Sequence, residues 1–236
     1  MTANETHFCM CPNLDENLSA EDKTALGQTK GAILNGAKWN PGETIKIRFL
    51  GGDVSLQNRV KEVALEWTQF ANLNLVFVQQ APTPIRIAFV QGRGSWSYLG
   101  TQCRQIKEPA PTMNYGWLTP SSSDEELRRV VLHEFGHALG LIHEHQNPQG
   151  GIKWNEAAVI NDLSGPPNNW DEKKIRDNMF AKYAGVTATN VDSESIMLYP
   201  VPKSWTLPDE SGNQFSSDTN SVLSDVDKNF IRDCYS

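Results

Sequence analysis

Four of the five histidines of this chain lie in one short stretch, His133 to His145. His133 and His137 are four residues apart, and on a helix two side chains at this spacing lie on the same face. Both imidazoles can therefore bind one zinc ion at ~2.0–2.1 Å. Gly140 has no Cβ and can adopt the left-handed conformation that ends a helix. The chain would then turn back and present His143 as a third ligand.

Three neutral histidines leave the fourth zinc position to water, which is the arrangement of a catalytic site. Glu134 follows the first ligand and is free to act on that water as a general base. A pair of histidines alone would also fit a solvated helix face or an incidental metal trap, but the third histidine at this spacing argues against both. We interpret His145 as a surface residue or a neighbour of the ligands, not as a fourth ligand.

The segment before these histidines has the features of a helix start. A serine in the run 121–123 followed three residues later by a glutamate forms a capping box, and the acidic first turn suits the helix dipole. Apolar residues then recur at helical spacing: Leu127, Val130, Val131, Phe135 and Ala138. The sequence therefore predicts that the metal site stands on a helix anchored in the core.

The pattern H-E-x-x-H-x-x-G-x-x-H, from His133 to His143, is the metzincin zinc signature. A metzincin implies a tight turn with a methionine beneath the metal, and the run 195–200, which contains Met197, resembles that turn. Tyr199 matches the position at which astacins and serralysins carry a tyrosine that can bind zinc and swing toward the oxyanion. The resemblance therefore implies that Tyr199 takes part in catalysis.

Within the metzincins, the chain is most similar to the astacins, from about residue 31 to the C-terminus. Glu144 matches the family glutamate that contacts the buried N-terminus of mature astacins, and the runs 143–148, 94–100 and 227–235 resemble family segments. The alternative hypothesis within the metzincins is a serralysin-like or matrixin-like enzyme. The absence of glycine-rich calcium-binding repeats argues against the serralysin form.

The astacin resemblance implies an α+β fold of the metzincin zincin type. It predicts a twisted, mostly parallel five-stranded sheet with two long helices in the N-terminal half, a loop-rich C-terminal half, and zinc in the cleft between them. We divide the chain into an N-terminal extension, residues 1–30, and a catalytic domain, residues 31–236, whose N-terminal subdomain runs to about 143 and whose C-terminal subdomain covers 144–236. The extension holds a polar, helix-compatible stretch, 17–28.

Periodicity places several elements within this division. Strands are predicted at 44–49, 73–78 and 85–90, and an amphipathic helix at 54–70. The stretch 103–120, with three prolines, is predicted to be mostly irregular. Further helices are expected at 154–162 and 171–183, and a last helix capped by Ser224 and ending at Cys234.

The function implied is that of a zinc-dependent metalloendopeptidase, in which Glu134 activates a metal-bound water for peptide bond hydrolysis. Two alternatives keep the same fold: a selective processing protease for one precursor, and a catalytically silent binding protein. The presence of Glu134, the expected general base, argues against the catalytically silent binding protein. An extended substrate would pair with an edge strand near Trp96 and Tyr98, which are either rim residues or ordinary edge aromatics.

Two cysteines in the extension suggest a latency switch. A thiolate binds zinc well, so Cys9 or Cys11 could fill the fourth zinc position and keep the enzyme a zymogen. Asp15 is the rival, because astacin prosegments commonly use an aspartate. The structural alternative is a disulfide from Cys9 or Cys11 to Cys103 or Cys234, among the three full pairings that four cysteines allow.

Composition limits the partners. The net charge is −7 without a basic cluster, which argues against nucleic acid as a partner. No apolar run approaches the ~20 residues that span a bilayer, and no signal-peptide core follows Met1. We expect a monomer that acts on protein or peptide substrates without a membrane. The even cysteine number and the resemblance favour a secreted protein, whereas the missing export signal allows a cytoplasmic one.

Overall fold

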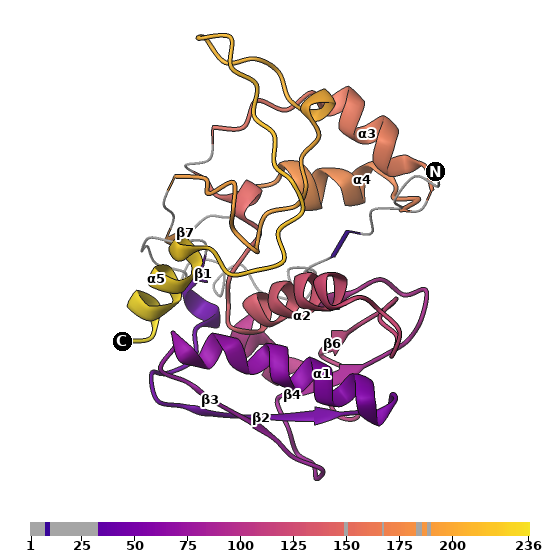
Figure 1. Cartoon of the computed structure of the whole chain (residues 1–236), viewed down its shortest axis with the longest axis vertical. Helices are drawn as coiled ribbons and strands as arrows, with labels where there is room; N and C mark the ends of the chain where they lie inside the picture. Colours follow the sequence, from indigo (N-terminus) through magenta and orange to yellow (C-terminus); the bar gives the residue numbers. More distant parts are fainter. Residues whose placement is uncertain (1–7, 10–32, 149–150, 167, 183–185, 188–189) are drawn as a thin grey trace.

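The computed structural model describes residues 8–9, 33–148, 151–166, 168–182, 186–187 and 190–236. The predicted helical stretch 17–28 lies outside these residues. In the described part, a sheet-containing N-terminal half and a loop-rich C-terminal half lie on either side of helix α2, Asp124–Ala138 (Figure 1). No helix among the described residues has both the length and the apolar character needed to cross a membrane.

The N-terminal half contains a five-stranded sheet in the order β3-β2-β4-β6-β5. Its strands are β2 Thr44–Phe49, β3 Asn74–Phe77, β4 Ile85–Ala88, β5 Trp96–Ser97 and β6 Met113–Asn114. All neighbouring pairs are parallel except β5 with β6, which places β5 antiparallel at one edge. This confirms the mostly parallel five-stranded sheet. The stretch 103–120 is mostly irregular, as predicted, apart from the end of the 3-10 helix Gly100–Gln105 and strand β6, whose two residues are too few to show an alternating pattern.

Helices α1, Val54–Ala64, and α2 contact each other in the N-terminal half. The Asp53 side chain caps α1 by accepting from the backbone N–H groups of Ser55 and Leu56. The helix is shorter than the predicted 54–70, because it tightens into 3-10 turns at Leu65–Gln69. In these turns Trp67 is buried, and its Nε1 donates to the carbonyl oxygen of Leu132 in α2 at 3.1 Å.

Two other aromatic side chains anchor the end of α2, where backbone carbonyls lack partners within the helix. Trp39 Nε1 donates to the oxygen of Ala138 at 2.8 Å, and the Tyr235 hydroxyl donates to the oxygen of Leu139 at 2.7 Å. Both rings are buried. Residues near both ends of the chain therefore fix the helix that carries the candidate ligands.

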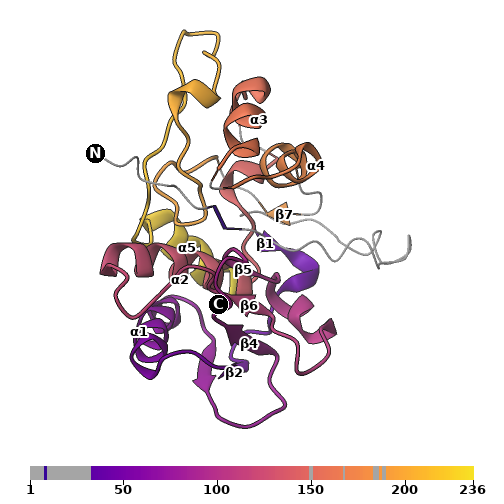
Figure 2. The same ribbon diagram turned by 90° about the vertical axis from the view of Figure 1, so that its right-hand side faces the viewer.

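The C-terminal half contains short helices joined by long loops (Figures 1 and 2). Its helices are α3 Glu156–Ser164, α4 Glu172–Ile175, which continues as a π-helical segment Arg176–Phe180, and α5 Asp225–Cys234. Helix α5 begins at the predicted cap, where Ser224 and Asp227 form a capping box. Strands β1, Ile33–Leu34, and β7, Val186–Thr187, form a separate antiparallel pair.

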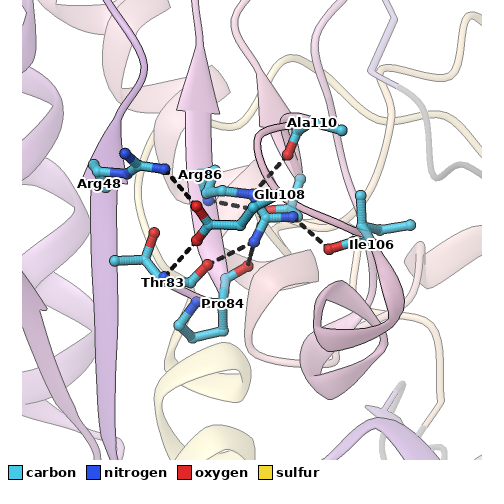
Figure 3. Close-up of polar contacts among 8 residues, drawn as sticks. Arg48, Thr83, Pro84, Arg86, Ile106, Glu108 and Ala110 are labelled. Carbon is cyan, nitrogen blue, oxygen red and sulfur yellow. Dashed lines mark hydrogen bonds and ion pairs between the residues drawn. The ribbon is translucent and has the colours of Figure 1, made fainter. Parts of the chain in front are cut away.

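A buried arginine ties the irregular segment 106–110 to the sheet (Figure 3). Arg86 of β4 donates to the backbone oxygens of Thr83, Ile106 and Ala110 at 2.6–2.7 Å. Glu108 accepts from Arg48 at 2.9 Å and from the Thr83 backbone N–H at 2.8 Å. The charged donor therefore satisfies carbonyl groups that a loop of this kind would otherwise leave buried without partners.

Candidate active site

The last two turns of α2 carry the candidate catalytic side chains. Ser123 is the N-cap of the helix, and its Oγ accepts from the Glu126 backbone N–H at 3.2 Å, which is the serine half of the predicted capping box. His133, Glu134 and His137 are all buried. After the helix, Gly140 has φ of +94°, which confirms the predicted left-handed turn.

Hydrogen bonds to backbone carbonyls orient the first two imidazoles. His133 Nδ1 lies 2.8 Å from the oxygen of Ile196, and His137 Nδ1 lies 2.8 Å from the oxygen of Leu141. A carbonyl oxygen only accepts, so each Nδ1 carries the proton. The Nε2 atom of each ring therefore keeps a lone pair for a metal.

The third imidazole is oriented by a side chain that the sequence did not single out. His143 Nδ1 lies 2.9 Å from Oε1 of Gln146, and Gln146 Nε2 donates to the oxygen of Asp177 at 2.9 Å. The second bond determines which end of the amide faces the ring, and Gln146 is buried. Its position three residues after the last ligand is the only signal that the sequence offered.

The three imidazoles converge. Their ligand atoms all lie within 4.8 Å of one another, and Nε2 of His137 is 3.2 Å from Nε2 of His143. Two ligands at zinc-bond length and a tetrahedral angle would be about 3.3 Å apart. His133 Nε2 has no hydrogen-bond partner among the described residues, although it is buried. Burial lowers the pKa of all three rings, to about 4 for His137, so they are neutral as a metal requires. The donor set therefore fits zinc.

Glu134 lies beside this cluster and is shielded from solvent. It is fully buried, and neither carboxylate oxygen forms a hydrogen bond within the described part of the chain. Burial raises its pKa well above the ordinary range, while the Cys9 thiol and Arg129 act in the opposite direction. A carboxyl group in this state can hold a proton near neutral pH.

The predicted methionine turn lies against α2. Met197 is buried, and a Cβ on Gly136 would lie under 3.0 Å from its sulfur. The turn is connected to the third ligand by the backbone N–H of Glu144, which donates to the oxygen of Met197 at 3.0 Å. It is also connected to α5, because Asp227 accepts from Ser195 Oγ at 2.7 Å and from the backbone N–H of Ile196 at 2.9 Å.

Tyr199 lies next to the histidines, as the resemblance implied. Its buried ring is 4.4 Å from that of His143 and 5.8 Å from that of His133, measured between centroids. Its hydroxyl donates to the backbone oxygen of Cys9. Glu144, the residue after the third ligand, bonds to another segment: its Oε1 accepts from the Asp192 backbone N–H at 3.2 Å, and burial raises its pKa to about 7.

The surface alternative for His145 was wrong. The residue is buried, its Nε2 lies 2.8 Å from the oxygen of Asn178, and its ring stacks on His143 with centroids 5.2 Å apart. It is not in the metal-ligand cluster. His145 therefore packs against the ring of His143 and helps to hold that candidate ligand in place.

Among the described cysteines, Cys9 lies at the site, whereas Cys103 and Cys234 lie away from it. Cys9 is buried with its thiol beside Glu134, although it is not in the metal-ligand cluster. Cys9, Cys103 and Cys234 are free, so the disulfide alternatives for Cys9 are not formed. Cys11 lies outside the described residues. Residues 8–9 lie between α2 and the C-terminal half (Figure 1).

The two expected rim aromatics stand at the sheet edge. Trp96 is in β5 and Tyr98 follows it, with rings 5.8 Å apart in an edge-to-face arrangement. Both are half-buried. Their position at the edge agrees with either interpretation, a substrate rim or ordinary edge packing.

Known proteins are similar to this chain in sequence and fold. The family model described as Astacin, a peptidase family, matches residues 33–204. A solved structure of myroilysin is similar with 42% identity and a TM-score of 0.82, covering 87% of this chain and 98% of the other. High choriolytic enzyme 1, a hatching enzyme zinc-protease from Oryzias latipes, has the same fold, with a TM-score of 0.50 and 15% identity over 90% of this chain and 95% of that one.

Two curated nematode proteins are similar over a shorter span. Zinc metalloproteinase dpy-31 of Teladorsagia circumcincta is 33% identical over 113 residues, and zinc metalloproteinase nas-30 of Caenorhabditis elegans is 25% identical over 128. The matches cover 47% and 54% of this chain but only 17% and 16% of the relatives. The family match covers most of the chain and includes the histidine cluster. The three-histidine cluster fits one catalytic zinc ion, and the chain belongs to the astacin peptidase family of zinc metalloendopeptidases.

Proposed function

We propose that the chain hydrolyses internal peptide bonds of protein or peptide substrates, with His133, His137 and His143 as the zinc ligands and Glu134 as the general base. The observation that carries this proposal is the convergence of three Nε2 atoms beside a buried carboxylate without a hydrogen-bond partner among the described residues. When bound, zinc supplies a Lewis acid that polarises a carbonyl group and makes water a stronger acid.

Glu134 would move the proton. Its carboxylate accepts a proton from the attacking water and later passes it to the leaving amine. Burial supports the second half of this role, because it raises the pKa and favours the protonated carboxyl group between the two steps. A bound zinc cation would favour the carboxylate that accepts the proton first. General acid and base catalysis of this kind contributes about 10²–10⁴ in rate.

Tyr199 would bind the oxygen of the attacked peptide group. Its hydroxyl already donates to a peptide oxygen, that of Cys9. In a substrate complex the same donor would stabilise the negative charge that develops on the carbonyl oxygen. Tyr199→Phe keeps the ring against His143 and removes the donor, so we expect kcat to fall by about 10²–10³ while zinc binding is retained.

The edge strand β5 would bind the substrate backbone. An extended peptide can add to an exposed sheet edge through main-chain hydrogen bonds, and pockets for its side chains then set preference. We propose that Trp96 and Tyr98 line the rim of this groove. Replacing either with alanine should raise KM more than it lowers kcat.

We also propose that residues 1–30 are a removable inhibitory segment and that Cys9 is its central residue. Its thiol lies beside Glu134, and its backbone oxygen accepts a hydrogen bond from the Tyr199 hydroxyl. A substrate would therefore have to displace Cys9 from both groups. In the zinc-loaded enzyme the thiolate would bind the metal at the fourth position. Latency of this kind suits a secreted protease, because the producing cell is protected until the segment is removed.

The experiment is cleavage of an unfolded protein mixture, read by mass spectrometry. Zinc-loaded full-length protein, a form that begins at Gly31, and full-length Glu134→Ala are compared, with bound zinc measured for each. We expect cleavage by the wild-type forms and none by the Glu134 variant. Stronger cleavage by the shortened form, reproduced in full-length Cys9→Ser but not in Cys11→Ser or Asp15→Asn, supports the Cys9 switch.

Other results would redirect the proposal. No cleavage by either wild-type form, with zinc bound, would favour a selective processing protease or a catalytically silent binding protein. Equal cleavage by wild-type protein and Cys9→Ser would remove the switch.

A further inference from the structure

Phe8 fills an aromatic pocket beside the candidate active site. Its ring stacks on Trp205 with centroids 5.6 Å apart, and it meets Tyr199 at 5.1 Å and Trp170 at 6.2 Å in edge-to-face arrangements. All four side chains are buried. Phe8 comes from the N-terminal extension, whereas the three pocket residues belong to the C-terminal half.

The walls of this pocket are held by contacts that do not involve Phe8. Trp205 Nε1 donates to Oδ2 of Asp162 at 2.7 Å, and the Trp170 backbone N–H donates to the oxygen of Leu163 at 3.0 Å. The ammonium group of Lys174 lies 5.0 Å from the Trp170 ring centroid. The pocket is thus built by its own half of the molecule, and Phe8 is its occupant.

The position of the next residue relates this pocket to the reactive groups. Cys9 has its thiol beside Glu134 and its backbone oxygen on the Tyr199 hydroxyl. A peptide bound here therefore places one side chain in the aromatic pocket when its adjacent residue lies at the catalytic groups. Tyr199 belongs to both places, since its ring forms a wall and its hydroxyl binds the peptide oxygen.

We infer that this pocket, once Phe8 leaves it, binds an aromatic or large apolar side chain of the substrate next to the bond that is cut. The inference rests on the proposed function, because it names the substrate class of the same site. Flat aromatic walls favour an aromatic ring through stacked and edge-to-face contacts. A carboxylate in the same place would lose water without gaining a paired charge from Trp170, Trp205 or Tyr199.

The test is a binding measurement on the full-length, zinc-loaded chain carrying Phe8→Ala and Glu134→Ala. The first change empties the pocket and the second prevents cleavage. Two pentapeptides, all alanine except for a central phenylalanine or a central aspartate, are titrated by calorimetry. Any remaining competition from the N-terminal segment weakens both peptides by the same factor, so the ratio of their affinities is preserved. We expect the phenylalanine peptide to bind about 10–200-fold more tightly.

Pocket variants in the same background complete the test. Trp205→Ala should remove most of the preference for the phenylalanine peptide. If circular dichroism shows that this variant does not fold, Trp170→Ala, which changes another wall of the pocket, replaces it. Leu207→Ala is the matched control, because this side chain is close in sequence to Trp205 but exposed, and it should keep the preference. Equal affinities, tighter binding of the aspartate peptide, or no binding of either would overturn the inference. Failure of the proposed function is distinguishable, since peptide preference would persist while the Glu134-containing protein cleaved nothing.

Discussion

Gly136 lies in α2 between Glu134 and His137, and its lack of a side chain makes room for the methionine turn. A Cβ at this position would lie under 3.0 Å from Met197 Sδ and 3.2 Å from Met197 Cε. Gly136→Ala therefore has two opposing effects. Alanine is favoured over glycine inside a helix by about 1 kcal/mol. Overpacking a buried site costs about 1–3 kcal/mol.

We expect the clash to dominate, because Met197 is buried and its backbone oxygen is bound by Glu144. The net destabilisation should be about 1–2 kcal/mol at the upper part of the overpacking range. For a chain of this size that lowers Tm by roughly 2–8 °C. The turn also supplies the Ile196 oxygen that orients His133, so affinity for zinc should fall as well. Thermal unfolding of the zinc-loaded protein and chelator competition measure the two effects.

A double-mutant cycle isolates the contact. In a Met197→Ala background the clash is absent, so Gly136→Ala should become stabilising by about 1 kcal/mol. Gly165→Ala is the control, because a Cβ there would meet only the Asp162 oxygen at 3.8 Å, and its effect should be small. If Gly136→Ala raised Tm, or changed it equally in both backgrounds, the steric reasoning would be refuted.

Three further results are expected. Gln146→Leu removes the acceptor that orients His143, so zinc affinity measured by chelator competition should fall about 10–100-fold. An affinity equal to that of the wild-type protein would contradict this role. Arg86→Met leaves buried carbonyl groups without a donor, so it should lower the free energy of unfolding, measured with denaturant, by about 3 kcal/mol or more and leave zinc affinity unchanged. A decrease of less than about 1 kcal/mol would count against the network. Burial raises the pKa of Cys103 from 9.0 to about 12, so at pH 9 the thiol stays protonated in the folded protein but is about half ionised in the unfolded one. Iodoacetamide should therefore label Cys103 only after denaturation, and rapid labelling of the folded protein would disprove its burial.

Much of the candidate site could be predicted because its information is local. The spacing of His133 and His137 follows from the pitch of one helix, and the serine cap and Gly140 set where that helix begins and turns. The family signature then implied the methionine turn and Tyr199. The sheet was predicted from the resemblance and from strand periodicity, except that β6 was too short to be detected.

The sequence by itself thus determined the candidate ligand set, the helix that carries two of its members, and the family. Only the tertiary structure decided which groups surround these residues: that Gln146 rather than a backbone oxygen holds the third imidazole, and that Cys9 binds Tyr199 across 190 positions of sequence. It also placed Phe8 against Trp170 and Trp205. The physical reason is one of range. Helix pitch and caps act within a few residues and leave a periodic trace, whereas contacts between distant segments depend on how the two halves pack and leave none.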